Sequence, residues 1–232
     1  MVRCIDTDVF MYTMTRREFR EAVDEGTVRL VIVPTGSCEQ HGDHLMLIHD
    51  TATVFHLAVR AAERLKPWVK VAPPIPFGYS EYWMSPEFRA GTITLRFEHF
   101  AAVLSDVLGS LRRQGVRNLM VLNGHGGNAR PVSSPFLEEL QRNLDAKIVF
   151  LSYWDVLSDI PVTDLMAKGK IPGHAGEFET SIALYLFPEA VRLSEVAEEE
   201  DKAATCEKGG RLVEAIVEGV VSRIRMEFGL QS

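Results

Sequence analysis

Short runs of apolar residues recur along the 232-residue chain, and most are bounded by glycine, proline or charged residues. Runs of about four to eight such residues, rich in valine, isoleucine and leucine, are typical of buried strands. We therefore predict five strands, at 28–33, 69–72, 92–95, 118–122 and 147–153. The first is expected to stop at Pro34 and the second at the pair Pro73-Pro74, because proline has no N–H to donate to a sheet.

Between these runs the apolar residues recur every three or four positions, which is the spacing of an amphipathic helix. The first such segment opens with Thr15 and Glu18, a capping-box pattern, and Gly26 follows its end. The segments that we predict as helices are 15–24, 51–65, 97–114, 136–143, 179–186 and 203–228.

Strands and helices alternate over the whole length, without an internal repeat or a break in composition. This order predicts an α/β fold with a largely parallel central sheet, and the length suits a single domain over residues 1–232. Ligands of such sheets bind beyond the carboxyl ends of the strands. Glu39, His41 and His125 come just after predicted strands, so we expect them at one site.

Composition and charge narrow the class of function. The chain has 46% hydrophobic and 25% charged residues, a net charge of −7 and a pI near 5.5. Nucleic acids and anionic membrane surfaces require a basic patch, so we expect neither as a partner. No apolar run of about 18 residues occurs, and the first residues lack a signal-peptide pattern. The three widely spaced cysteines do not suggest a disulfide framework, and we expect a cytoplasmic protein.

Side chains that bind metal ions are concentrated in three glycine-containing clusters. In the first cluster Glu39 and His41 are two residues apart, so in an extended segment both project to the same side. Asp50 precedes the helix predicted from Thr51, and its short carboxylate can bridge two cations. The alternative is that Asp50 only caps that helix, which would not explain the neighbouring Glu39 and His41.

Three other residues of this region have alternative interpretations. His44 and His49 could donate hydrogen bonds to the ligands or lie at the surface, and we favour the surface for His49. Cys38 could be a thiol nucleophile with His41 as its base. A free cysteine is more often a small buried hydrophobic residue, and we favour that interpretation.

The second cluster is the glycine-rich loop Asn123-Gly124-His125-Gly126-Gly127-Asn128. Its glycines let the backbone turn sharply beside a ligand, and His125 is a candidate metal ligand. Gly126 and Gly127 are candidates for contact with substrate. The alternative is a phosphate-binding loop, but the spacing matches neither the dinucleotide fingerprint nor the Walker loop.

The third cluster extends from Gly173 to Glu179. His174 is a candidate for proton transfer, and Glu177 and Glu179 compete for a remaining metal position. Glu177 is also a catalytic candidate. The alternative is that both glutamates are only the acidic first turn of a helix. A cluster that also contains His174 favours a functional site.

The loop 77–91 is rich in aromatic residues, among them Tyr82 and Trp83. These two side chains are candidates for stacking on a flat substrate. They could equally pack the loop itself or fill a contact between subunits, and the pattern does not decide between these alternatives.

Together the three clusters resemble the creatininase (creatinine amidohydrolase) family. The resemblance rests on the segment 36–45 with Asp50, on the loop 123–128, on His174-Ala175-Gly176 followed by Glu179-Thr180-Ser181, and on the segment 91–95. It covers about residues 30 to 190, with the motifs in the right order. It implies a three-layer α/β sandwich, commonly assembled as a hexamer, with two divalent ions per chain. These ions would be zinc or manganese, with iron also possible.

The resemblance also assigns the ligands. It gives Glu39 and His125 to one metal, His41 to the other, and Asp50 to both. Creatininase proper takes its remaining ligand from a glutamate at the position of Gly127.

Two departures from the family pattern follow. Because Gly127 has no side chain, we expect Glu179 to supply the missing ligand, with Glu177 as the alternative. Tyr82 stands where many relatives carry histidine after a Ser-Glu pair.

The function that we predict is a metal-dependent hydrolase acting on the carbon–nitrogen bond of a small cyclic or linear amide. His174 would pass a proton to the leaving nitrogen. A close alternative is the ring-opening hydrolysis of a cyclic ketone or lactone at the same site. A non-catalytic metal- or ligand-binding relative is a second alternative, and a nucleotide-binding protein using loop 123–128 is a third. The intact ligand set argues against a non-catalytic relative, and the missing nucleotide fingerprint argues against a nucleotide-binding protein.

Overall fold

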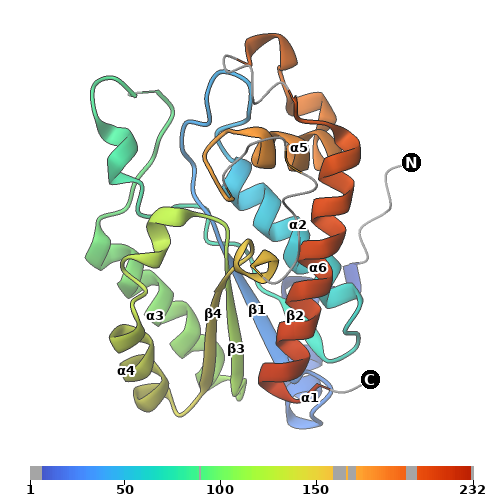
Figure 1. Cartoon of the computed structure of the whole chain (residues 1–232). Helices are drawn as coiled ribbons and strands as arrows, with labels where there is room; N and C mark the ends of the chain where they lie inside the picture. The colour runs from blue at the N-terminus through green and yellow to red at the C-terminus, as the bar shows by residue number, and fades with distance from the viewer. Residues whose placement is uncertain (1–6, 89, 159–165, 167–170, 197–202, 231–232) are drawn as a thin grey trace.

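The computed structural model describes residues 7–88, 90–158, 166, 171–196 and 203–230. At its centre is a four-stranded sheet of order β2-β1-β3-β4 in which every pair is parallel (Figure 1). The strands are β1 (Leu30–Thr35), β2 (Val69–Val71), β3 (Asn118–Asn123) and β4 (Lys147–Ser152). The predicted α/β fold with a parallel central sheet is confirmed.

Helices cover both faces of the sheet (Figure 1). One layer consists of α2 (His49–Glu63), α5 (Glu177–Leu186) and α6 (Cys206–Phe228), and the other of α1 (Arg16–Asp24), α3 (Phe97–Arg113) and α4 (Ser134–Leu144). Along β1, Leu30 and Ile32 pack in the first layer, whereas Val31 and Val33 pack in the second. Both faces of the strand are therefore buried, which explains its continuous apolar run.

The predicted helices are all present, with ends that differ by no more than three residues. The capping box of α1 forms as expected: Thr15 Oγ1 accepts from Glu18 N at 3.3 Å, and Glu18 Oε2 accepts from Thr15 N at 2.7 Å. The last helix, α6, begins later than expected, because Thr205 Oγ1 caps it by accepting from Lys208 N.

Two predictions about strands are wrong. The first strand, β1, continues through Pro34 to Thr35. The Pro34 carbonyl accepts from Ile75 N, which lies in the segment after β2. The missing N–H of Pro34 is on this same side of the strand. No hydrogen bond between strands of the sheet is therefore lost at the proline. The segment 92–95 is not a strand of the sheet. Its Ile93 forms only an isolated antiparallel bridge with Cys38, because the segment runs along the loop after β1.

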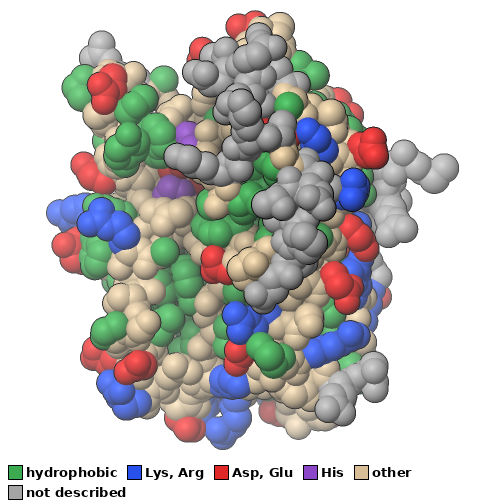
Figure 2. All heavy atoms as spheres, in the orientation of Figure 1, with side chains coloured by type: hydrophobic (Ala, Val, Ile, Leu, Met, Phe, Trp, Pro, Cys, Tyr) green, Lys and Arg blue, Asp and Glu red, His purple; other side chains and the backbone are tan. Residues whose placement is uncertain are grey.

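The carboxyl ends of three strands are level with one another. Thr35 pairs with Asn123, and Asn123 pairs with Ser152, so β1, β3 and β4 end at the same edge. Histidine side chains are visible in a hollow of the molecular surface (Figure 2). Across the described ranges, no helix combines the length and the apolar character needed to cross a membrane.

Candidate metal centre

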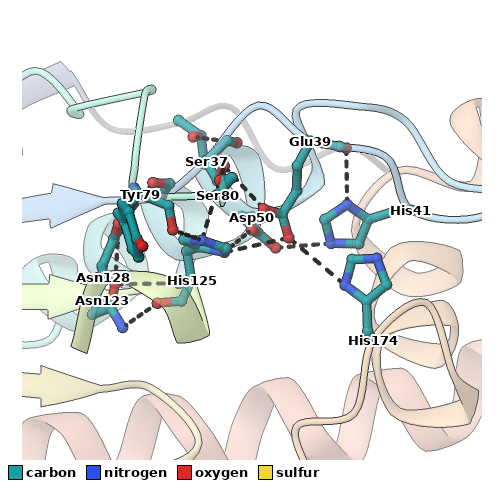
Figure 3. Close-up of polar contacts among 12 residues, drawn as sticks. Ser37, Glu39, His41, Asp50, Tyr79, Ser80, Asn123, His125, Asn128 and His174 are labelled. Carbon is teal, nitrogen blue, oxygen red and sulfur yellow. Dashed lines mark hydrogen bonds and ion pairs between the residues drawn. The ribbon is translucent and has the colours of Figure 1, made fainter. Parts of the chain in front are cut away.

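Five of the predicted side chains meet in one buried cluster at this edge of the sheet, much of it drawn in Figure 3. They are Glu39 and His41 from the loop after β1, Asp50 from the first turn of α2, His125 from the loop after β3, and Glu179 from the first turn of α5. None of the five is more than 6% exposed. Carboxylates buried so closely together require positive partners.

Asp50 is the centre of the cluster, and its two oxygens face different ligands. Oδ1 lies 2.9 Å from His41 Nε2, and Oδ2 lies 3.0 Å from His125 Nδ1. Glu39 Oε1 is 3.3 Å from His125 Nδ1, and Glu179 Oε2 is 3.9 Å from His41 Nε2. Two groups of three contain Asp50, namely Glu39/Asp50/His125 and His41/Asp50/Glu179, and a third consists of Glu39, His41 and His174. In each group the ligand atoms lie within 4.8 Å of one another.

The contacts at Asp50 are short ion pairs with poor hydrogen-bond geometry. Within the described residues, His41 Nε2 and Asp50 Oδ2 are buried and have no hydrogen-bond partner, despite approaches of 2.9 and 3.0 Å. Buried polar atoms are seldom left in this state unless an ion or a water satisfies them. Imidazole nitrogens and carboxylate oxygens are the donor set of divalent transition metals. The residues present therefore fit a pair of divalent cations.

Backbone carbonyls determine which nitrogen of each imidazole faces Asp50. His41 Nδ1 lies 3.1 Å from Glu39 O, and His125 Nε2 lies 3.0 Å from Tyr79 O. A carbonyl oxygen only accepts, so each of these nitrogens carries the proton. The other nitrogen of each ring, Nε2 of His41 and Nδ1 of His125, is then the one available to a cation.

The charges of the cluster displace the pKa values of its members. Burial lowers the pKa of both His41 and His125, but the neighbouring carboxylates, Asp50 above all, outweigh it and raise both values to about 10. Burial raises the pKa of Asp50, but His41 and His125 overcome this effect and hold that pKa below its usual range. Burial also raises the pKa of Glu179, to about 8, although His41 opposes the shift. Without cations, protons therefore occupy the ring nitrogens that face Asp50.

His174 approaches the cluster from the loop before α5. Its ring stacks on that of Trp83, with centroids 4.0 Å apart and planes at 23°, and its Nδ1 lies 3.7 Å from Glu39 Oε1. Gln40 Oε1 accepts from Gly42 N at 3.0 Å, so the Gln40 amide nitrogen must be the donor in its 3.1 Å contact with His174 Nε2. The proton of neutral His174 is therefore on Nδ1, facing the cluster.

The turn that carries His174 is strained. Ala175 has φ +51, a conformation that residues other than glycine rarely adopt. Its N–H donates to Glu179 Oε2 at 2.5 Å, which ties the turn to the cluster.

Burial, reinforced by the charge of His41, lowers the pKa of His174 to about 4, so the ring is neutral at pH 7.

Two buried asparagines shape the glycine-rich loop. Asn123 Nδ2 donates to His125 O at 2.8 Å, and Asn123 Oδ1 accepts from His125 N at 3.2 Å. Asn128 Nδ2 donates to Gly36 O at 3.0 Å, while its Oδ1 accepts from Tyr79 N at 3.0 Å. The Asn128 side chain thus joins the loop after β1 to the segment that carries Tyr79.

Gly127 is a point of close approach within this loop. A Cβ atom built there would lie 2.0 Å from Tyr79 O and 2.4 Å from His125 Nε2. The contact between these two atoms therefore requires glycine at position 127. Gly126, by contrast, has open space in the direction of a side chain.

Glu177 lies apart from the ligand groups. Its buried carboxylate binds Lys208 Nζ of α6 at 2.5 Å, and it belongs to none of the groups that the structure brings together. Glu179, two residues later on α5, is the glutamate that joins the cluster.

Two alternative interpretations of the first cluster are wrong. Asp50 does not cap α2, because the helix begins at His49 and Ile48 occupies the N-cap position. His49 is not a surface residue but fully buried, with its ring centroid 5.1 Å from that of His41. His44 is also buried and bonds Thr180 Oγ1 through Nε2 at 2.9 Å.

Cys38 is partly exposed, and its Sγ lies 3.8 Å from Gly91 O. Burial, with smaller contributions from Glu39 and Asp50, raises the pKa of its thiol. The environment therefore disfavours the thiolate that a nucleophilic role requires.

Two adjoining cavities open beside the cluster. The first, of about 180 Å³, is lined by four cluster residues, by His174 and Trp83, and by Gly126 and Gly127. The second, of about 350 Å³, shares Trp83, His125 and Gly127 with the first and extends to Tyr82 and Arg130. Tyr82, which lines only the second cavity, is 72% exposed, whereas Trp83 lines both.

Sequence reasoning did not identify several residues that contact the cluster, among them Ser37, Gln40, Tyr79 and Ser80. The spacing of Ser37 could have indicated its role, because a residue two positions before Glu39 in an extended segment projects to the same side as Glu39. Tyr79 and Ser80 had none, because they reach His125 across 46 and 45 residues of sequence.

The similarities to known proteins agree with this geometry. A family model described as creatinine amidohydrolase matches residues 12–222. The creatinine amidohydrolase of Pseudomonas putida is 29% identical over 95% of this chain and 97% of its own. The 3-dehydro-scyllo-inosose hydrolase of Thermotoga maritima is 32% identical over 79% of this chain, which spans 58% of that protein. A creatininase structure with manganese superposes with a TM-score of 0.85, at 29% identity, over 95% of this chain and 98% of the other.

A parallel three-layer fold with a cluster of histidines and carboxylates at the carboxyl edge of its sheet defines a candidate metal hydrolase. The chain belongs to the creatininase family.

Proposed function

We propose that this protein is a metal-dependent amidohydrolase that holds two divalent cations, zinc or manganese. The observation that carries the proposal is the position of Asp50, whose two oxygens each complete a separate group of three ligands. Glu39 and His125 would hold one cation with Asp50, and His41 and Glu179 the other. When bound, the cations supply an activated water and polarise the scissile carbonyl.

The remaining residues act on the substrate. His174 presents an N–H at Nδ1 to the cavity, where it donates a hydrogen bond to the leaving nitrogen; it would transfer a proton there only from the imidazolium form, after taking up the proton that the attacking water loses. Trp83 holds the His174 ring by stacking and forms one wall for a planar group. Gly126 and Gly127 line the same cavity, and we assign their backbone N–H groups to the carbonyl oxygen of the substrate.

The volumes of the two cavities indicate how large a substrate the site can accept. The reacting amide occupies the cavity of about 180 Å³ beside the cluster. The adjoining cavity of about 350 Å³ accepts whatever part of the substrate extends past Trp83 toward Tyr82 and Arg130. A cyclic or linear amide larger than its reacting group would use both spaces.

A second candidate reaction is the ring-opening hydrolysis of a cyclic ketone at the same cluster. The similarity to the 3-dehydro-scyllo-inosose hydrolase favours it, at 32% identity over 79% of this chain. Cleavage of a carbon–carbon bond in the ring would again place His174 beside the leaving atom.

Metal analysis and a substrate panel test the proposal. Purified protein should contain about two divalent cations per chain, as two groups of three ligands require. The metal-loaded protein should hydrolyse members of a panel of cyclic and linear amides, with cyclic ketones as the second series. Protein that retains no zinc or manganese after dialysis, and that hydrolyses neither series, contradicts the proposal.

Glu179→Gln is expected to lose one of the two cations. A neutral amide is a poor replacement for a carboxylate on a hard cation, and Glu179 belongs to only one group of ligands. Glu177→Gln is the matched control, because Glu177 binds Lys208 instead and its variant should keep both cations. Elemental analysis of the two variants compares them directly, and loss of a cation only in Glu177→Gln would reverse the assignment.

Cation affinity is expected to rise with pH between about 6 and 9. The pKa values of His41 and His125 are raised to about 10, so a proton occupies each ring nitrogen that a cation must take. Binding therefore releases about one proton per histidine, and each pH unit strengthens binding up to about tenfold per proton released. Calorimetry in two buffers with different ionisation enthalpies counts these protons. An affinity that is flat or falling over this range contradicts the assignment.

We also propose a homo-oligomer of a single creatininase-like domain in the cytoplasm. Exposed apolar side chains in the segment 82–93 favour a contact between subunits, since Tyr82, Met84 and Ile93 are 72%, 46% and 50% exposed.

A further inference from the structure

Two buried serines connect Glu39 to His125 behind the cluster (Figure 3). Ser37 Oγ donates to Glu39 Oε2 at 3.3 Å, and Ser37 Oγ and Ser80 Oγ are 2.5 Å apart. Ser80 Oγ is 3.2 Å from His125 Nε2. Both serines are at most 2% exposed, so water does not compete for these bonds.

The direction of every hydrogen bond in this row is determined. His125 Nε2 donates, because it also lies 3.0 Å from Tyr79 O, which can only accept. Glu39 accepts, because a carboxylate has no proton to give. Each hydroxyl has one proton, so Ser80 accepts from His125 and donates to Ser37, and Ser37 donates to Glu39.

This pattern of donors and acceptors leaves one lone pair of His125 and one of Glu39 facing the cluster. The proton on Nε2 of His125 leaves the Nδ1 lone pair facing Asp50 Oδ2 and Glu39 Oε1. The bond to Ser37 occupies Glu39 Oε2 and leaves Oε1 for the cluster. Glu39 and His125 belong to the same ligand group, whereas among the described residues neither serine hydroxyl forms a hydrogen bond with His41 or Glu179.

We propose that Ser37 and Ser80 are positioning residues that hold Glu39 and His125 as ligands of one cation. The proposal rests on the metal site of the proposed function, and it adds an asymmetry between the two cation positions. Removing either hydroxyl weakens cation binding at the site formed by Glu39 and His125. Cation binding at the site formed by His41 and Glu179 is unchanged. Hydrogen-bond partners of metal ligands typically change metal affinity by about 10- to 100-fold.

Zinc titration of the metal-free protein tests this inference. Ser80→Ala and Ser37→Ala should each convert two tight binding steps into one tight step and one step weakened by about 10- to 100-fold. Ser85→Ala is the control, because it removes a hydroxyl from the same loop whose only partner among the described residues is the exposed Glu87. Combining Ser80→Ala with Glu179→Gln should weaken the single cation that remains.

The outcomes separate this inference from the function on which it rests. Wild-type protein that binds no zinc overturns both. Wild-type protein that binds two zinc ions, with Ser37→Ala and Ser80→Ala unchanged, overturns the positioning role alone. Equal weakening of both steps also overturns it, since a general structural effect does not distinguish the positions. If Ser80→Ala fails to fold, Ser80→Cys keeps the size and a weak donor, and should give an affinity between those expected for serine and alanine.

Discussion

Asp50→Ala is expected to remove dinuclear binding altogether and to lower turnover by about 10³-fold or more. Asp50 contributes one oxygen to each of the two ligand groups that contain it, so its loss leaves two ligands in each of these groups, fewer than a stable site requires. A metal ion contributes several kcal/mol of transition-state stabilisation, and each 1.4 kcal/mol corresponds to a factor of about ten. Elemental analysis, together with the effect of added zinc on the melting temperature, measures the loss.

Asp43→Ala is the matched control for Asp50→Ala. Asp43 lies in the same loop, but it is exposed and belongs to none of the ligand groups. Its variant should retain both cations and should still be stabilised by zinc, as expected for a ligand that binds only the folded state. If Asp50→Ala protein retains two cations, Asp50 does not bridge them.

His174→Asn is expected to keep both cations while losing about 10²- to 10⁴-fold in turnover, the usual contribution of a general acid–base. The asparagine amide can place an N–H near the position of His174 Nδ1, but it cannot transfer that proton. This variant therefore separates proton transfer from hydrogen bonding. Turnover with unchanged metal content is the measurement.

Metal content is also the result that could reverse this assignment. His174 Nδ1 lies 3.7 Å from Glu39 Oε1, and His174 forms a third group with Glu39 and His41. If His174→Asn loses a cation and Glu179→Gln does not, His174 is the ligand. If both variants keep both cations and full turnover, the third cluster has only a structural role.

The sequence could predict the sheet and the local parts of the site because both depend on near neighbours in the chain. Alternation of apolar runs with helical segments defined the layers. Glu39, His41 and His125 follow strand ends, and the parallel register brings those ends to one edge. Asp50 was placed by its position at the start of a helix that leaves the same edge.

The remaining features depend on tertiary packing. Glu177 and Glu179 are both in the first turn of α5, and only the position of Lys208 on α6 shows which of them faces away. The sequence favours the surface for His49, because nothing local indicates that α2 buries its first turn against the cluster. The segment 92–95 has the composition of a strand, yet its hydrogen bonds go to loops at Cys38 and Gly78.

The close approach at Gly127 restricts which side chain position 127 can carry. A glutamate placed at that position, where the family resemblance expects a ligand, would collide with Tyr79 O and His125 Nε2 before its carboxylate reached a cation. Neighbouring substitutions of this kind are strongly non-additive. A mutant library confined to position 127 should therefore yield no glutamate variant with restored creatininase-type ligation. Creatininase-type ligation in this chain therefore requires a further change that moves Tyr79 O and the His125 ring away from position 127.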